Sequence, residues 1–235
     1  FLSRVFAQGG ERKETQATRS GRRDKETEEI ATTCIETMTE KKPTLCIVAG
    51  PNGSGKTSTT IQLLHYEWGD NSLYINPDNI AQEKFGDWNS ADAVLKAAEY
   101  ATKLRYKCLH EKSDFVFETV FSSEEKLEFV KKAKEAGFFI RLFFVCTSDP
   151  AINVNRITQR YLDGGHEVPI SKVISRYYKS LSNAGLAISM VDRAYVYDNS
   201  IENQMPQLLF RTISGKMFKQ YSNTIPEWAR MLVQE

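Results

Sequence analysis

The segment that most constrains this chain is residues 50–57, which read GPNGSGKT. An apolar run at 45–49 precedes it, and the pattern at 58–66 predicts a helix after it. A strand, a glycine-rich loop and a helix in this order are the context that a P-loop requires. The glycines let consecutive backbone N–H groups point at a polyphosphate, and the helix N-terminus adds a partial positive charge. We therefore expect this segment to bind a nucleotide.

The expected nucleotide-binding residues are Gly50, Pro51, Asn52, Gly53, Ser54, Gly55, Lys56 and Thr57. In a P-loop of this form the lysine reaches the β- and γ-phosphates, and the threonine hydroxyl holds Mg²⁺. We therefore expect ATP and Mg²⁺ as the cofactors, with Thr57 as the metal ligand. The alternative is a glycine-rich turn that only joins two elements, and it leaves Lys56 without a purpose.

The charge balance gives no electrostatic argument for nucleic acid as a partner. Among 235 residues, 31 Lys and Arg stand against 30 Asp and Glu, for a formal net charge of +1. No apolar run approaches the ~20 residues that cross a bilayer, and no signal-peptide pattern is present. Cys46 and Cys146 lie in apolar segments and are expected to be buried thiols, as in a reducing compartment. We expect a cytoplasmic protein without a membrane or nucleic-acid partner.

The first forty residues differ in composition from the rest. Residues 8–24 are almost free of large apolar side chains, which predicts a solvated linker. Over 24–40 an apolar stripe recurs at helical spacing, formed by Ile30, Cys34, Ile35 and Met38. This amphipathic helix either packs on the sheet or covers the nucleotide site. We expect a polar linker and helix over 1–42 and a kinase domain over 43–235.

Short apolar segments alternate with helical patterns after residue 43. The expected strands are 45–49, 72–75, 115–117, 138–145 and 194–197. Strands that alternate with helices predict an α/β fold with a doubly wound parallel sheet, here with a short helical lid. Ligands of such sheets lie beyond the carboxyl ends of the strands. Four side chains that follow strand ends are therefore expected to converge: Lys56, Asp78, Glu118 and Asp198.

Local patterns predict three further features. The helix expected over 90–110 has an apolar face, which we predict to be Val94, Leu95, Ala98, Ala101, Leu104 and Cys108. Ser122 and Glu125 have the spacing of a capping box at the start of the next helix. Residues 208–218 predict a hairpin around Gly215.

Two carboxylates at strand ends are candidates for the chemistry. Asp78 is positioned to accept a proton from an acceptor hydroxyl as that hydroxyl attacks the γ-phosphate. Its alternative role is to cap the helix that follows. Glu118, with its neighbour Thr119, ends an apolar strand that resembles a Walker B segment. Glu118 either orients Mg²⁺ through water or binds the acceptor, and a structural salt bridge is the competing role.

Three arginines flank the glycine pair Gly164–Gly165. Arg160 and Arg176 bracket this turn and are expected to close over the transferred phosphoryl group, because its oxygens gain charge in the transition state. Arg156 is four residues before Arg160 and is expected to contact the substrate. A solvated basic helix face is the alternative. His166 is expected to form hydrogen bonds in the lid rather than to catalyse.

Several of these segments together resemble the zeta-toxin family of P-loop kinases. They are the P-loop with the preceding Ala49, the run Asn76-Pro77-Asp78, the run Phe117-Glu118-Thr119, and Arg160-x-x-x-Gly164-Gly165-His166-x-Val168-Pro169-x6-Arg176-Tyr177. The resemblance extends from Thr44 to about Ser200. Its glycine-glycine-histidine turn is typical of the small bacterial branch of the family.

The resemblance implies a fold and a set of roles. Family members are related in fold to nucleoside monophosphate kinases, and the best understood phosphorylate UDP-N-acetylglucosamine and are silenced by an epsilon antitoxin. By this resemblance Asp78 is the catalytic base and Lys56 is the lysine that binds ATP. Arg160 and Arg176 are the arginines at the γ-phosphate, and Glu118 lies near the substrate.

We therefore expect an ATP-dependent kinase that phosphorylates a hydroxyl of a small molecule, with a sugar nucleotide of the UDP-N-acetylglucosamine type as the first candidate. We expect it to act as the toxin of a toxin–antitoxin pair, with an antitoxin as its protein partner. Glu118, Thr119 and Arg156 are the expected substrate-binding residues. The alternatives are a kinase of another metabolite or of an antibiotic, or a nucleotide-dependent binding module with weak ATPase activity.

Overall fold

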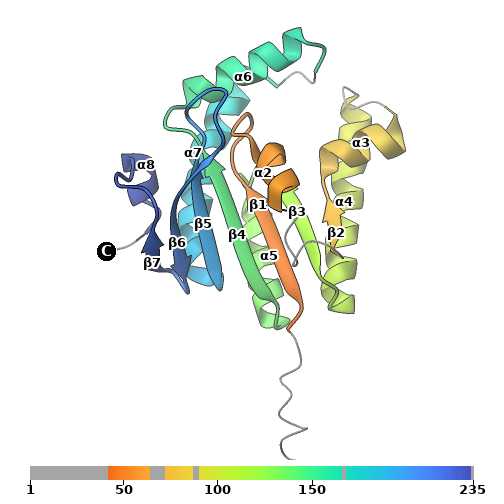
Figure 1. Cartoon of the computed structure of the whole chain (residues 1–235). Coiled ribbons are helices and arrows are strands. Elements are labelled where there is room, and N and C mark those ends of the chain that lie inside the picture. The colour runs from red at the N-terminus through yellow and green to blue at the C-terminus, as the bar shows by residue number, and fades with distance from the viewer. Residues whose placement is uncertain (1–41, 64–71, 87–89, 166–167, 234–235) are drawn as a thin grey trace, which may run out of the picture. The chain divides into compact units, whose positions relative to one another are not determined.

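Residues 42–235 form one compact unit in the computed structural model (Figure 1). The structure describes four stretches of this unit: 42–63, 72–86, 90–165 and 168–233. The helix expected over 24–40 and the expected lid residue His166 lie outside these stretches. None of the helices within them is long and apolar enough to cross a membrane.

Strands and helices alternate along the described chain, as the sequence predicts. The strands are β1 (Thr44–Ala49), β2 (Leu73–Ile75), β3 (Phe115–Thr119), β4 (Phe139–Cys146), β5 (Arg193–Asp198), β6 (Gln207–Ile213) and β7 (Lys216–Gln220). The helices are α2 (Lys56–Leu63), α3 (Pro77–Phe85), α4 (Ala91–Glu111), α5 (Glu124–Glu135), α6 (Pro150–Leu162), α7 (Ile170–Met190) and α8 (Glu227–Arg230).

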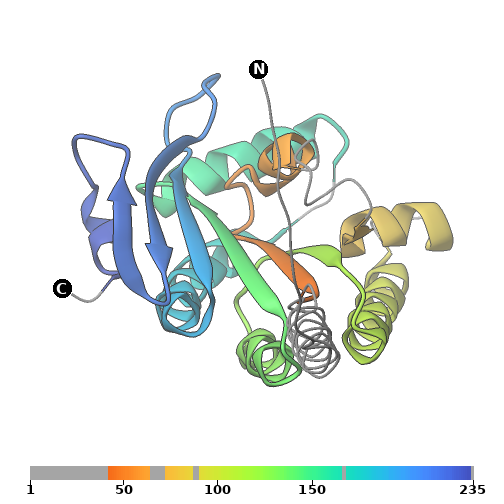
Figure 2. The same cartoon turned by 60° about the horizontal axis from the view of Figure 1, so that its bottom comes forward.

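The described strands form one sheet in the order β2-β3-β1-β4-β5-β6-β7. The strands from β2 to β5 pair in parallel, whereas β6 and β7 add an antiparallel edge. Helices cover both faces: α4, α5 and α7 lie on one, and α2 and α6 on the other (Figure 2). The predicted α/β fold with a mainly parallel sheet is confirmed. The predicted hairpin is the β6–β7 unit, where Ser214 and Gly215 take the positive φ of 48° and 79° that a tight hairpin turn requires.

The core lies mainly between the sheet and the helices α4, α5 and α7. Phe115 and Phe117 of β3 project into it, and the ring of Phe129 from α5 meets both edge to face, at centroid distances of 6.3 and 5.6 Å. Aromatic pairs in this geometry contribute about 0.5–1.5 kcal/mol beyond the burial of their area. This packing fixes β3, the strand that ends in Glu118 and Thr119.

The predicted apolar face of α4 is partly wrong. The buried side chains are Ala93, Ala97, Ala101, Arg105 and Cys108, whereas Val94 and Leu95 are 38% and 60% exposed. The small alanines let α4 approach its neighbours closely, and a buried arginine occupies part of the face. A ranking by hydrophobicity alone prefers Val and Leu to Ala and Arg, and it therefore rotates the predicted face.

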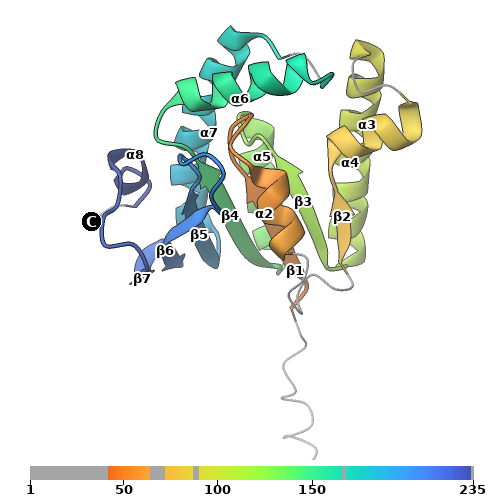
Figure 3. The same cartoon turned by 45° about the horizontal axis from the view of Figure 1, so that its top comes forward.

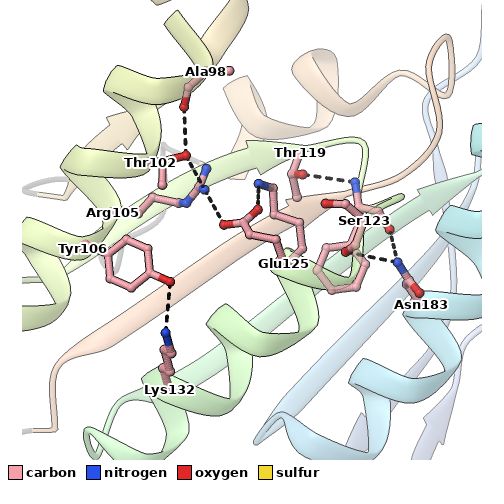
Figure 4. A network of polar contacts seen from close by, with 11 residues as sticks. Ala98, Thr102, Arg105, Tyr106, Thr119, Ser123, Glu125, Lys132 and Asn183 are labelled. Atoms are coloured by element: carbon pink, nitrogen blue, oxygen red, sulfur yellow. Dashed lines mark hydrogen bonds and ion pairs between the residues drawn. The ribbon is translucent and has the colours of Figure 1, made fainter. Parts of the chain in front are cut away.

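Arg105 can be buried because its charge is paired and its planar guanidinium lies over aromatic rings. Its guanidinium lies 5.2 Å from the ring centroid of Phe117 and 5.5 Å from that of Phe129, and it forms a 2.9 Å ion pair with Glu125 (Figure 4). This contact also corrects the predicted capping box. Helix α5 begins at Glu124 with Ser123 and not Ser122 as its cap, so Glu125 is not three residues after the cap. The Ser123 side chain forms no capping hydrogen bond, and the Glu125 carboxylate is engaged by Arg105.

Candidate active site

The loop between β1 and α2 has a backbone that only glycine allows at two positions. Gly50 has φ of 154°, and a Cβ there would lie 2.0 Å from the carbonyl oxygen of Val145 on β4. Gly55 has φ of 89°, and a Cβ there would lie 2.2 Å from Nδ2 of Asn199. Both glycines therefore let the loop pass close to its neighbours while it curls over the N-terminus of α2. This geometry fits the cradle that a polyphosphate requires.

Two asparagine side chains hold the loop in place. Asn153 of α6 is fully buried, and its Nδ2 donates to the carbonyl oxygen of Asn52 at 2.6 Å. Asn199, just after β5, donates through Nδ2 to the carbonyl oxygen of Ser54 at 2.8 Å. Neither residue is among those predicted from the sequence. The available signal was their position, because Asn199 follows a strand end and Asn153 lies in the first turns of the helix after β4.

We predict that Asn153→Ala weakens both the fold and nucleotide binding. The substitution removes the donor to the partly buried carbonyl oxygen of Asn52, and the loss of such a hydrogen bond costs about 0.5–1.5 kcal/mol. The melting temperature should fall, and the affinity for ATP should fall several-fold because the loop is less well fixed. The matched control is Asn155→Ala, an exposed position on the same helix. Equal melting temperatures and ATP affinities for the two variants would contradict this role.

Lys56 is placed for an anionic ligand. Its Nζ donates to the carbonyl oxygen of Pro51 at 3.0 Å, a neutral partner within the loop. Burial lowers the pKa of the Lys56 ammonium, the carboxylates of Glu118 and Asp78 oppose this shift, and Arg160 adds to it. The predicted residues of β3, α3 and α6 are thus close enough to act on Lys56. The carbonyl of Pro51 carries no charge, so a bound polyphosphate would supply the negative charge that this hydrogen-bond partner of the ammonium lacks.

Glu118 points at the helix that follows the P-loop. Its Oε1 accepts from the Thr57 hydroxyl at 2.9 Å, and its Oε2 accepts from Thr60 at 3.2 Å and from Tyr74 at 2.8 Å. Burial, and next the charge of Glu118, raise the pKa of Tyr74, so its hydroxyl remains a donor. A hydroxyl and a carboxylate are oxygen groups of the kind that Mg²⁺ prefers. Within the described residues, no group of three or more His, Cys, Asp or Glu could hold a metal.

Asp78 is not the helix cap. The cap of α3 is Asn76, whose Oδ1 accepts from the backbone N–H of Asp78 at 2.9 Å. The Asp78 carboxylate is exposed and, among the described residues, has neither a hydrogen bond nor an ion pair. The alternative of a capping role is therefore removed. The carboxylate lies at the carboxyl end of β2, on the β3 side of the P-loop.

The predicted arginines lie on different sides of the loop. Arg176 of α7 reaches Asn52 of the P-loop, where its Nη1 lies 3.4 Å from Oδ1. Arg160 is exposed in the last turn of α6, which passes over the P-loop (Figure 3). Arg156 instead donates to the carbonyl oxygen of Asn199 at 2.9 Å. Asn199 directly follows β5, and in the sheet order β5 and β2 lie on opposite sides of β1. The Arg156 contact is therefore on the other side of the P-loop strand from Asp78.

Two other predicted residues serve the local structure. Thr119 is buried, and its Oγ1 accepts from the backbone N–H of Phe121 at 3.1 Å, so its hydroxyl holds the loop after β3. Asp198 accepts from the backbone N–H of Ser200 at 3.1 Å and so fixes the loop after β5. Of the four predicted strand-end residues, Lys56, Glu118 and Asp78 share one neighbourhood. Asp198 lies at the same edge of the sheet, where the next residue, Asn199, contacts Ser54 of the P-loop.

Comparison with known proteins agrees with this arrangement. The profile of the family described as Zeta toxin matches residues 27–205, about three quarters of the chain. The chain belongs to the zeta toxin family. The resemblance seen in the sequence is thereby confirmed, and so is the enzyme class, a P-loop phosphotransferase.

Individual relatives are more distant. An uncharacterized protein of Haemophilus influenzae is 29% identical over 128 residues, which are 54% of this chain and 88% of the relative. The structure of the PezAT toxin–antitoxin system of Streptococcus pneumoniae matches with a TM-score of 0.56 at 15% identity and covers 89% of this chain and 86% of that one. A complex of AvrRxo1-ORF1 and -ORF2 with ATP matches with a TM-score of 0.57 at 18% identity, over 75% of this chain. The matched part is only 60% of that AvrRxo1 chain.

Proposed function

We propose that the protein transfers the γ-phosphoryl group of ATP to a hydroxyl of a small molecule, and that it acts as the toxin of a toxin–antitoxin pair. The observation that supports the transfer reaction is the Asp78 carboxylate, which does not cap the helix and lies close enough to the P-loop lysine Lys56 to act on it. A domain that only bound nucleotide would not need an exposed, unpaired carboxylate on this side of the loop. The first candidate acceptor is a sugar nucleotide of the UDP-N-acetylglucosamine type, which is an inference from the family.

The P-loop residues would bind and orient ATP. Backbone N–H groups of residues 50–57 and the ammonium of Lys56 would hold its phosphates, consistent with the fold shared with a complex that contains ATP. Thr57 would hold Mg²⁺, with Glu118 oriented toward the same hydroxyl at 2.9 Å. The ion would neutralise charge on the β- and γ-phosphate oxygens.

Asp78 would accept the proton of the acceptor hydroxyl as its oxygen attacks the γ-phosphorus. The bond from phosphorus to the β,γ-bridging oxygen breaks as the new one forms, and ADP leaves. Arg160 and Arg176 would stabilise the charge that spreads over the transferred oxygens. In this arrangement the base, Asp78, follows β2, whereas Arg160 lies in α6 and Arg176 in α7.

The direct test is transfer from labelled ATP in the presence of Mg²⁺ and UDP-N-acetylglucosamine, read by mass spectrometry. The expected product is the acceptor with one added phosphoryl group, formed by wild type and not by Asp78→Asn. A metabolite extract serves as a second acceptor source. ATP hydrolysis without a labelled acceptor from either source would contradict a kinase and favour the binding module.

Family and fold also support a protein partner. The PezAT structure is of a toxin–antitoxin system by its own description. We propose that a separate antitoxin restrains this enzyme as well. Co-expression with a neighbouring reading frame should relieve growth inhibition by the wild-type chain, and Asp78→Asn should not inhibit growth with or without it.

We predict that Arg160→Ala and Arg176→Ala lower turnover far more than they weaken ATP binding. The positive charge of these side chains is needed mainly in the transition state, where negative charge spreads over the transferred phosphoryl oxygens. The loss should therefore appear in kcat. Steady-state kinetics with ATP titrations measure both. Arg193→Ala, at the amino end of β5, removes the same charge far from the loop and should leave kcat nearly unchanged. Equal losses in binding and kcat would indicate a general electrostatic effect instead.

A further inference from the structure

Hydrogen bonds through Glu118 join the P-loop helix to the edge of the sheet. Its Oε1 accepts from the Thr57 hydroxyl at 2.9 Å, and its Oε2 accepts from the Tyr74 hydroxyl at 2.8 Å. Thr57 lies in the first turn of α2, whereas Tyr74 lies in β2, the edge strand that α3 follows (Figure 1). One carboxylate therefore contacts both the P-loop helix and the strand that leads to Asp78.

Asn76 extends these contacts to the backbone of Asp78. Its Nδ2 donates to the Tyr74 hydroxyl at 2.9 Å and to Oε2 of Glu118 at 3.4 Å. Its Oδ1 accepts from the backbone N–H of Asp78 at 2.9 Å and so caps α3. A serine or an aspartate would also cap the helix, but neither has the amide NH₂ group that reaches two oxygens here. We call the side chains of Thr57, Glu118, Tyr74 and Asn76 the Glu118 network.

The centre of the Glu118 network is shielded from water. Asn76 and Glu118 are 5% and 8% exposed, and Glu118 forms no ion pair with a described residue. Its charge is therefore stabilised by hydroxyl and amide donors, and hydrogen bonds to a charged group are stronger than those between neutral groups. The Asp78 carboxylate, in contrast, has no such bond to the described part of the chain. Its position therefore follows from its backbone, which Asn76 holds.

We propose that Tyr74 and Asn76 are positioning residues, which hold Asp78 in a fixed place relative to the P-loop through Glu118. A nucleotide in the P-loop fixes the first turn of α2 and with it Thr57. The Glu118 network then transmits this restraint to the first turn of α3, so the base is held most firmly when the phosphoryl donor is bound. This inference rests on the proposed function, in which Asp78 is the base, and it names the residues that place that base.

Tyr74→Phe and Asn76→Ser each break one link of the network. Phenylalanine keeps the ring without the hydroxyl, and serine keeps a good helix cap without the amide NH₂ group. With UDP-N-acetylglucosamine as the acceptor, both should lower kcat at least about tenfold, because a misplacement of about 1 Å can cost about 10²-fold. The KM for ATP should stay within a few-fold of wild type. The matched control is Tyr100→Phe, which removes the hydroxyl that Lys84 contacts in the last turn of α3 and should react like wild type.

A double-mutant comparison separates positioning from a purely structural role. If Tyr74 acts through the base, Tyr74→Phe should lower single-turnover transfer at least about tenfold in the wild-type background. In the Asp78→Asn background, where the base is already absent, the same substitution should lower it less than about twofold. Equal fold-losses in the two backgrounds would overturn the inference, because Tyr74 would then support the fold and not the base. Melting temperatures confirm that each variant is folded.

Hydrogen exchange tests the same coupling without an acceptor. A non-hydrolysable ATP analogue with Mg²⁺ should slow exchange of the backbone N–H groups of α2 and α3 in wild type, but only those of α2 in Tyr74→Phe. If α3 responds equally in the two proteins while α2 is slowed in both, the inference is wrong and nucleotide binding stands. If neither helix of wild type responds, the nucleotide-binding function itself fails. If Asp78→Asn transfers as fast as wild type, the proposed base is wrong, and the network places no catalytic group.

Discussion

Lys56→Ala should abolish most of the thermal stabilisation that ATP and Mg²⁺ give the wild-type protein. The P-loop then keeps its backbone N–H groups but loses the ammonium that lies beside the carbonyl of Pro51. Hydrogen bonds to charged groups contribute about 1.5–3 kcal/mol, which corresponds to a roughly 10- to 100-fold loss of affinity. At a ligand concentration of 100 Kd the wild type gains about 2.7 kcal/mol, and a 100-fold weaker variant gains only about 0.4 kcal/mol. Thermal shift titrations measure this difference directly.

The protein without nucleotide should respond differently to the same substitution. Burial lowers the pKa of Lys56, so the folded state disfavours the charged form that is present at neutral pH. Its removal should therefore leave the melting temperature of the free protein equal or higher. Lys103→Ala, on the exposed face of α4, is the control and should keep the full response to ATP. If ATP and Mg²⁺ stabilise Lys56→Ala as much as wild type, the P-loop assignment is wrong.

The fold and the nucleotide loop could be predicted because both depend on local pattern. The run GPNGSGKT needs only its own glycines and the strand and helix at its ends, and all three are visible in sequence. The meeting of Lys56, Asp78 and Glu118 follows from the rule that parallel strands end at one edge. The four residues that follow the strand ends therefore lie at one edge of the sheet, as predicted, with Asp78 and Glu118 close enough to act on Lys56.

Contacts between distant segments could not be predicted in this way. Asn153 is 101 residues from the carbonyl that it supports, and Arg105 is 20 residues from Glu125. Neither pair is marked by a pattern in the neighbouring sequence. A prediction by hydrophobicity also assigns Arg105 to the exposed face of α4, whereas it is buried. The sequence also left Asp78 as base or cap, because both roles fit a polar residue before a helix. The hydrogen bond of Asn76 removes the second role.

Asp78→Asn should lower phosphoryl transfer at least ~10²-fold, the contribution typical of a positioned general base. The amide keeps the shape of the side chain and loses the ability to accept the proton. ATP affinity should remain within a few-fold of wild type, since no described contact joins Asp78 to the P-loop backbone. Single-turnover transfer from labelled ATP, with binding measured separately by calorimetry, separates the chemical step from nucleotide binding.

The stability of this variant makes the test decisive. Because Asn76 is the cap of α3, the loss of the Asp78 charge should remove its interaction with the first turn, about 0.3–1 kcal/mol, and its attraction to Lys56, but no cap of the helix. A fall in turnover could then not result from unfolding. Asn79→Ala alters the next residue of the same turn and should retain turnover within a few-fold. Should Asp78→Asn behave like Asn79→Ala, Asp78 is merely an acidic residue at a helix N-terminus, and the proton acceptor lies elsewhere.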